Sequence, residues 1–163
     1  MNPSIPTVTA IAVAVVVVGH HVLVGKRSHL AREGPGLDEF PGGKVERGEL
    51  GDVAARRECL EETGLDVQIL RTLDKATGSA SFGPLEVTFF LAWPRGLARG
   101  APLPKVSPPF AWRTVAEIAR LTFPQTNRRV VAMLSDLLDE SCASQAIGPT
   151  NAQGGSKPPG CQG

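Results

Sequence analysis

The chain is poor in the residue types that mark secreted, membrane-spanning or nucleic-acid-binding proteins. Its 163 residues hold three cysteines, far apart and without CxxC spacing, at Cys59, Cys142 and Cys161. An odd number at such spacing argues against a disulfide framework or a zinc site and favours a reducing compartment, so we expect a cytoplasmic protein. Aromatic residues make up only 5% of the chain, and the formal net charge is +1. A nucleic-acid-binding surface is therefore not expected, since it needs basic and aromatic side chains together.

Long hydrophobic runs are also missing. No apolar segment reaches the roughly 18 residues that a membrane-spanning helix needs, so we expect no membrane partner. The strongest run, residues 7–18 (TVTAIAVAVVVV), has no Lys or Arg before it and no clear cleavage site after it, which disfavours a signal peptide. Its β-branched residues and alanines suit a strand that is buried on both faces.

The remaining pattern predicts a mixture of strands and helices. Apolar periodicity predicts strands at residues 13–18, 22–24, 67–73 and 85–93. Helical patterns occur at residues 53–63, 114–120 and 125–138. Asp52 is the expected N-cap of the first helix, and Gly64 its left-handed C-terminal residue. We therefore expect an α/β fold with one mixed sheet and helices on both sides, in a single domain over residues 1–140. Residues 141–163, rich in Gly, Ser, Pro and Gln, are expected to form a disordered tail.

The helix predicted over residues 53–63 carries an unusual charge pattern. Glu58, Glu61 and Glu62 stand at i, i+3 and i+4, so their carboxylates project from one face and repel each other. Two interpretations fit: a solvated acidic face, or an oxygen-ligand site for Mg²⁺ or Mn²⁺. No lysine is interleaved with these three acids, which favours the metal site.

The residues before this helix support a metal site. Gly42 and Gly43 follow a proline and allow the backbone to pass close to the helix or to a ligand, where side chains would interfere. Glu49 lies in the loop before the helix, where a reversal of the chain could bring it toward the same metal cluster. Arg57 is expected to pair with Glu49 and hold that loop in place.

The stretch from Gly43 to Leu65 resembles the Nudix box, G-x5-E-x7-R-E-U-x-E-E-x-G-U, in which U is aliphatic. Its defined positions are filled by Gly43, Glu49, Arg57, Glu58, Cys59, Glu61, Glu62, Gly64 and Leu65. The one departure is Cys59 in place of an aliphatic residue, and a buried cysteine behaves as a small hydrophobe. A motif with this many constrained positions is specific, and the resemblance extends over about residues 7–139.

This resemblance implies an α/β/α sandwich and the hydrolysis of a nucleoside diphosphate linked to another group. The ligands that it implies for Mg²⁺, or for Mn²⁺, are Glu58, Glu61 and Glu62, with Glu49 and the carbonyl of Gly42 as further candidates. The catalytic residues that it implies are Glu61, Glu58 and Arg57. A metal-activated water would attack phosphorus, while the positive ions stabilise the charge that develops.

A closer resemblance concerns the substrate. Residues 38–46 (DEFPGGKVE) and 123–127 (FPQTN) are similar to the MutT subgroup, which converts 8-oxo-dGTP to the monophosphate and pyrophosphate. By this resemblance Asn127 reads the oxidised guanine, because its amide can accept from the N7–H of the oxo form while donating to O6. The other residues expected to bind the nucleotide are Phe40, Arg27, Phe89 and Lys44.

Some of these assignments have competing interpretations. Asn127 could instead cap a helix, which asparagine often does. Phe89 and Phe90 alternate across a strand, so one of them belongs to the core whatever the other does. The alignment through residues 25–36 is ambiguous by a residue, so the cation at the nucleotide could also be Lys26 or Arg32.

One loop departs from the MutT pattern. Residues 102–112 (PLPKVSPPFAW) contain no acid, whereas the subgroup carries a glutamate there. The leading hypothesis is a Mg²⁺-dependent diphosphatase of oxidised purine nucleoside triphosphates. The alternatives are a Nudix hydrolase of another nucleotide derivative (a dNTP or CTP, a dinucleoside polyphosphate or a nucleotide sugar) and a nucleotide-sensing Nudix module without catalysis. We expect a monomer or homodimer that binds a small-molecule nucleotide.

Overall fold

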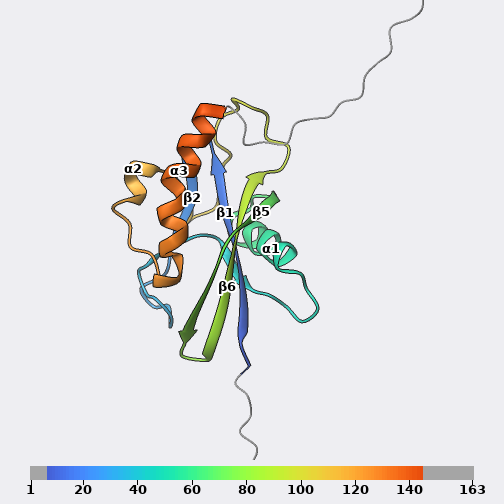
Figure 1. Cartoon of the computed structure of the whole chain (residues 1–163), viewed down its shortest axis with the longest axis vertical. Coiled ribbons are helices and arrows are strands. Elements are labelled where there is room, and N and C mark those ends of the chain that lie inside the picture. Colours follow the sequence, from blue (N-terminus) through green and yellow to red (C-terminus); the bar gives the residue numbers. More distant parts are fainter. Residues whose placement is uncertain (1–6, 145–163) are drawn as a thin grey trace, which may run out of the picture.

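The structure, a computed structural model, describes residues 7–144, in which one sheet lies between two layers of helix (Figure 1). The strands are β1 (Thr9–Val18), β2 (His21–Lys26), β3 (Asp38–Glu39), β4 (Gly42–Lys44), β5 (Val67–Ala80), β6 (Gly83–Pro94) and β7 (Ala111–Thr114). The helices are α1 (Gly51–Thr63), α2 (Val115–Ile118), the 3-10 turn η1 (Gln125–Asn127) and α3 (Arg128–Ser144). Within residues 7–144, no helix is long and apolar enough to cross a membrane.

The central strand β1 gives the sheet its mixed character. It runs parallel to β6 along one edge and antiparallel to β2 and β4 along the other. β4 pairs with the first half of β1, and β2 pairs with its end. Residues 12–18 of β1 are all buried, so the prediction of a strand covered on both faces is confirmed.

The two faces of the sheet have different cores, because successive side chains of β1 alternate between them. Toward α3, Val13, Val15 and Val17 pack in a cluster with Phe89 and Leu134. Toward α1, a second cluster includes the small side chains of Ala12, Ala14, Ala54, Ala55 and Cys59, none of which has any exposed surface. With α1 on one face and α3 on the other, the predicted α/β/α sandwich with a mixed sheet is confirmed.

The ends of α1 are partly as predicted. Gly64 has a φ of 74° and donates its N–H to the carbonyl of Leu60, which confirms the left-handed C-terminal residue. The N-cap prediction was wrong: Leu50 holds that position without a side-chain cap, and Asp52 lies one residue inside the helix. There its negative charge still stabilises the N-terminal end of the helix.

Two strand segments differ from the prediction. β5 runs on past residue 73 to Ala80 and pairs along its length with β6, which makes a long hairpin. Residues 74–80 (DKATGSA) are polar or small, so they carry little apolar periodicity. β7 was not predicted, because it is only four residues long and follows the proline-rich loop; it pairs with β2 and extends the sheet.

The C-terminal helices also differ in extent. The helix expected over residues 114–120 is reduced to α2, whose N-cap Thr114 forms a capping box with Glu117. The helix expected over residues 125–138 consists of η1 followed by α3. α3 continues to Ser144, past the residue at which the tail was expected to begin. Residues 145–163 lie outside the described residues, and a disordered tail there stays a prediction.

Candidate active site

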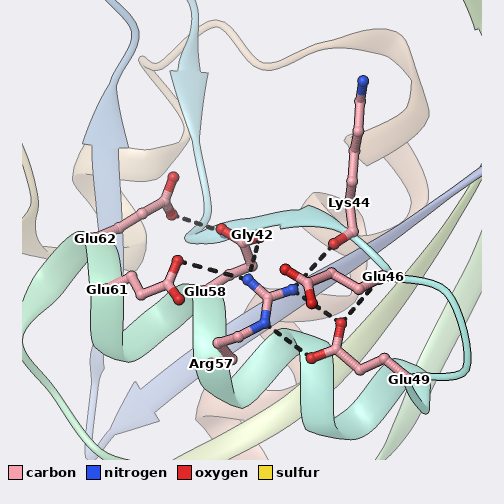
Figure 2. Close-up of polar contacts among 8 residues, drawn as sticks. All are labelled: Gly42, Lys44, Glu46, Glu49, Arg57, Glu58, Glu61 and Glu62. Atoms are coloured by element: carbon pink, nitrogen blue, oxygen red, sulfur yellow. Dashed lines mark hydrogen bonds and ion pairs between the residues drawn. The ribbon is translucent and has the colours of Figure 1, made fainter.

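Three carboxylates, those of Glu49, Glu58 and Glu61, surround the guanidinium of Arg57 on α1 (Figure 2). Its Nε and Nη2 donate to the two carboxylate oxygens of Glu49 at 2.8 and 2.9 Å, and its Nη1 donates to Glu58 at 2.7 Å. Nη2 also reaches the carbonyl of Lys44 at 3.1 Å, and Nη1 lies 3.5 Å from a carboxylate oxygen of Glu61. The predicted pair of Arg57 and Glu49 is confirmed, and this bidentate contact ties the preceding loop to α1.

Glu49 is fully engaged in this arrangement. Hydrogen bonding from Arg57, followed by the backbone N–H of Glu46, lowers the pKa of Glu49 to about 2. The Glu46 N–H donates to Oε2 at 2.9 Å, so both oxygens of Glu49 have partners. Glu49 therefore anchors the loop in this structure. Its role as a metal ligand would require it to release Arg57, and stays a prediction.

Glu62 has a different environment from the other acids of α1. The N–H of Gly42 donates to its Oε2 at 2.9 Å. The carbonyl of Gly42 as a metal ligand stays a prediction. Burial raises the pKa of Glu62 to about 7, against the lowering effect of the Gly42 hydrogen bond, and the negative charges of Glu39 and Glu58 add to the rise. The positive charge of Arg27 opposes this rise.

The two glycines of β4 allow the strand to lie directly against its neighbours. A Cβ added to Gly43 would lie 2.4 Å from the carboxyl carbon of Glu58. A Cβ on Gly42 would lie 2.5 Å from the carbonyl oxygen of Ala12 on β1. The expected close approach of the backbone is therefore confirmed, and it brings β4 to the acidic face of α1.

Within residues 7–144, no three His, Cys, Asp or Glu side chains converge as a metal site. The contacts give the reason: Glu58 is turned toward Arg57, Glu62 toward Gly42, and the side chain of Glu61 is 58% exposed. The donor set nevertheless fits Mg²⁺ or Mn²⁺, because it consists of hard oxygen ligands on adjacent turns of one helix.

A cavity of about 480 Å³ opens beside Glu62. Acidic and basic side chains both line it, namely Glu39 and Glu62 with Lys26 and Arg27. Phe110, from the segment just before β7, also contributes; its ring packs on β2 at Gly25, where a Cβ would lie 2.6 Å away. The cavity therefore joins the acidic helix to a basic segment at the end of β2.

Glu39 is a cavity residue to which the sequence analysis gave no role. β3 directs Asp38 and Glu39 to opposite faces. Asp38 is buried and accepts the backbone N–H of Thr122 at 2.8 Å, whereas Glu39 lines the cavity and pairs with Arg27. The signal that could have revealed this is the alternation of side chains along an extended segment. Asp38 and Phe40 are both buried, so Glu39 between them points the other way.

Of the cations considered for the nucleotide, two lie at this cavity. Arg27 lines it and pairs through Nε with Glu39, as described above. Lys26 lines it as well, although its side chain is 53% exposed. Arg32 is exposed and is not among the lining residues. Arg27 is thus the better placed of the three alternatives.

The other predicted nucleotide-binding side chains lie elsewhere. Phe40 is 4% exposed and stacks on Phe123 with ring centroids 4.9 Å apart, and Phe89 is fully buried in the α3-side core. Lys44 extends away from the acids (Figure 2), and its ammonium lies 4.6 Å from the ring centroid of Phe82. The binding roles of Phe40, Phe89 and Lys44 stay predictions.

Asn127 is buried in η1, immediately before α3. Its Oδ1 accepts the hydroxyl of Thr126 at 3.1 Å, and its backbone N–H donates to the carbonyl of Pro124 at 2.9 Å. Among residues 7–144, its Nδ2 has no hydrogen-bond partner. The amide donor is therefore uncommitted, and both base reading and helix capping by Asn127 stay predictions.

The fold and the acidic helix together define a known class of hydrolase. The NUDIX domain family matches residues 8–134 of the chain, so the chain belongs to the Nudix family and is a Nudix hydrolase, a pyrophosphohydrolase. A more particular similarity is to the 8-oxo-dGTP diphosphatase of Escherichia coli (strain K12). The two chains are 32% identical over 99 residues, which cover 61% of this chain and 74% of that protein.

Solved structures share the fold. The MutT protein from Methanosarcina mazei Go1 superposes with a TM-score of 0.61 at 19% identity, over 82% of this chain and 94% of that one. The E. coli ORF135 protein superposes with a TM-score of 0.59 at 18% identity, over 86% and 95% of the two chains. At these identities the similarity shows the fold alone. Nudix enzymes bind nucleotide-derived substrates and typically use a divalent metal.

Proposed function

We propose that the chain is a Mg²⁺-dependent nucleoside triphosphate diphosphatase that converts 8-oxo-dGTP to the monophosphate and pyrophosphate. The observation that carries the proposal is the cavity in which Lys26 and Arg27 lie together with Glu39 and Glu62. A triphosphate with its cations needs both signs of charge, because carboxylates hold the metal while basic side chains bind phosphate oxygens. The similarity to the E. coli 8-oxo-dGTP diphosphatase supports the choice of substrate.

The residues of α1 would prepare the reaction site. Bound Mg²⁺, or Mn²⁺ in its place, would activate a water molecule and neutralise charge on the phosphates. The side chains that would hold it are Glu58, Glu61 and Glu62, with Glu49 and Gly42 as further candidates. Arg57 orients Glu58 through its 2.7 Å hydrogen bond and keeps the loop at Glu49 against the helix.

The base would be read by Asn127. Its uncommitted Nδ2 can donate to O6 of the oxidised guanine. Its Oδ1 can accept N7–H in place of the Thr126 hydroxyl, which lies 3.1 Å away. Unmodified guanine carries no hydrogen on N7, so this pair of bonds would distinguish the two bases.

A nucleotide panel tests the substrate. Pyrophosphate release is measured with Mg²⁺ and with Mn²⁺ for 8-oxo-dGTP, the four dNTPs, CTP, a dinucleoside polyphosphate and a nucleotide sugar. We expect 8-oxo-dGTP to give the highest kcat/KM. Asn127→Ala should reduce kcat/KM for 8-oxo-dGTP at least about tenfold more than for dGTP, because a buried hydrogen-bonding group is lost. Gln125→Ala, an exposed position in the same turn, is the control.

Residues 102–112 lack the glutamate that the MutT subgroup carries there. This departure is the reason for including the other nucleotides in the panel. A different best substrate would reject 8-oxo-dGTP but keep the Nudix reaction. An equal loss on all nucleotides in Asn127→Ala would reject base reading. Glu61→Gln, if it abolishes activity without unfolding the chain, excludes a purely nucleotide-sensing role. A cytoplasmic location, which the cysteine content supports, and a monomeric or homodimeric state complete the proposal.

A further inference from the structure

Leu50 occupies the N-cap of α1 without capping the helix. Its side chain makes no cap hydrogen bond and is 69% exposed. Serine, threonine, aspartate or asparagine would accept a backbone N–H of the first turn, so a leucine here is unfavourable for the helix. Val53, one turn further along α1, is 50% exposed, and neither side chain belongs to the core clusters of residues 7–144. These two apolar side chains therefore serve neither the helix end nor the core.

A second cavity, of about 610 Å³, opens beside Leu50 on the α1 side of the sheet. Its apolar floor includes Ile69 and the ring of Phe90. Phe90 lies directly under the start of α1, because a Cβ on Gly51 would be 3.2 Å from its ring. The β5–β6 hairpin extends past α1 (Figure 1), so the helix covers only part of this face of the sheet. Of the described residues that line this cavity, none lines the one beside the acidic face of α1, so the two surfaces are separate.

Four charged side chains surround this second cavity. Arg71 and Lys75 come from β5, Glu86 from β6 and Asp52 from α1, and all four are exposed. Lys75 lies diagonally across from Glu86, because its direct partner on β6 is Thr88. Even so, none of the four charged side chains makes an ion pair within residues 7–144. The cavity thus carries unpaired charges of both signs, basic along β5 and acidic on the elements beside it.

This arrangement of charges suits a second copy of the same chain. In a two-fold interface the same surface lies on both sides, so a contact from one residue to another is repeated in the opposite direction. A basic strand beside acidic residues is then complementary to itself. A uniformly basic or uniformly acidic partner would place like charges against half of this surface.

We propose that the chain forms a symmetric homodimer through this second cavity. Leu50 and Val53 of each copy cover the apolar floor of the other, and Lys75 pairs with the partner's Glu86. The interface leaves the cavity beside Glu62 open to its substrate, since the two cavities have separate linings. The inference does not depend on which nucleotide the enzyme hydrolyses.

Sedimentation velocity of the full chain over a dilution series measures the association. We expect a dimer that dissociates on dilution. Leu50→Ser should weaken dimerisation at least about tenfold, because it removes a central apolar contact. Serine is a good N-cap, so the melting temperature of the dilute, monomeric protein should not fall. Leu30→Ser, at a leucine that is 94% exposed in another loop, is the control and should dimerise as the wild type does.

Charge reversal tests the pairing between the two copies. Lys75→Glu and Glu86→Lys should each weaken the dimer about tenfold, because each places like charges opposite one another. The double variant restores opposite charges across the interface and should dimerise nearly as the wild type does. Arg99→Glu, at an exposed loop position, changes the net charge as much as Lys75→Glu and should leave the dimer unchanged.

Three results would overturn the proposal. A chain that stays monomeric at every concentration has no second copy at this cavity. A dimer that Leu50→Ser and both charge reversals leave unchanged forms through another surface. A double variant that associates as weakly as the single reversals would show that Lys75 and Glu86 do not meet between the copies.

Discussion

The carboxyl group of Glu58 fills the space that a side chain on Gly43 would occupy. The two residues come from different elements, β4 and α1, and a Cβ on Gly43 would lie 2.5 and 2.6 Å from the two carboxylate oxygens. The contact involves the far end of a flexible side chain, so Glu58 could move aside at little cost to the fold. The position of its carboxylate depends on the absence of a side chain at Gly43.

Gly43→Ala should therefore separate activity from stability. We expect Glu58 to turn away from β4, which removes a proposed metal ligand from its place. kcat should fall by about 100-fold, the order of magnitude for a misplaced catalytic group, while the melting temperature changes little. Steady-state kinetics and thermal unfolding of the same preparation check this. A variant with normal kcat would show that the position of Glu58 does not matter.

Arg57→Lys tests the guanidinium contacts that hold the loop at Glu49 against α1. Lysine is a point charge and cannot reach Glu49, Glu58 and the Lys44 carbonyl together, as Arg57 does. We expect kcat to fall by about 100-fold. The matched control is Arg56→Lys, one residue earlier, where the arginine pairs with the half-buried Asp66. Its kcat should stay within about twofold, and equal losses in both variants would contradict a specific role for Arg57.

Glu62 should make the metal-free protein less stable as the pH rises. Its pKa is about 7 in the folded chain, against 4.5 as the ordinary value. Between these values the folded state keeps a proton that the unfolded state releases, so stability falls as pH rises and the loss is complete above about pH 7. The free energy of unfolding of the wild type relative to Glu62→Gln, measured with EDTA, should therefore decrease from about pH 5 to about pH 8.

Glu49 provides the control for this pH dependence. Its pKa is lowered to about 2, so its contribution to stability is present above about pH 4.5 and is lost only as pH falls toward 2. The difference between wild type and Glu49→Gln should stay constant from about pH 5 to about pH 8. A constant difference for Glu62→Gln as well would show that Glu62 titrates normally.

Asp74 and Arg129 form a pair whose burial is unequal. The side chain of Asp74 is 8% exposed and that of Arg129 71% exposed, with 3.3 Å between Oδ1 and Nη1. The other oxygen of Asp74 is buried and has no hydrogen-bond partner within residues 7–144. Arg129→Met should lower the free energy of unfolding by about 1–2 kcal/mol, because it leaves a buried carboxylate without its cation. Urea unfolding measures this, with Arg128→Met, its exposed neighbour, as the control.

The acidic face of α1 could be predicted from the sequence because helical geometry alone brings Glu58, Glu61 and Glu62 together. The pair of Arg57 and Glu49 was predictable for a similar reason, because Glu49 lies in the loop directly before α1 and Arg57 lies on α1. These relationships are local: they span a single helix and the loop before it. The N-cap of α1 was predicted wrongly: Leu50 holds this position, and not Asp52.

The cavity could not be predicted in the same way, because its walls come from distant segments. Glu39 and Arg27 meet through the pairing of β2 with β3, and Phe110 arrives from the segment before β7. β7 itself has too few residues to show a period. The burial of Phe40 against Phe123 likewise depends on packing between segments that are far apart in sequence.

The alanine contact between β1 and α1 has a consequence for how this enzyme can be altered. Ala12 and Ala14 of β1 lie in one cluster with Ala54 and Ala55 of α1, and all four side chains are fully buried. A larger residue there could not repack locally and would push the helix outward as a unit. Every carboxylate on its far side would move with it. Turnover can therefore be changed by the size of side chains that never meet the substrate.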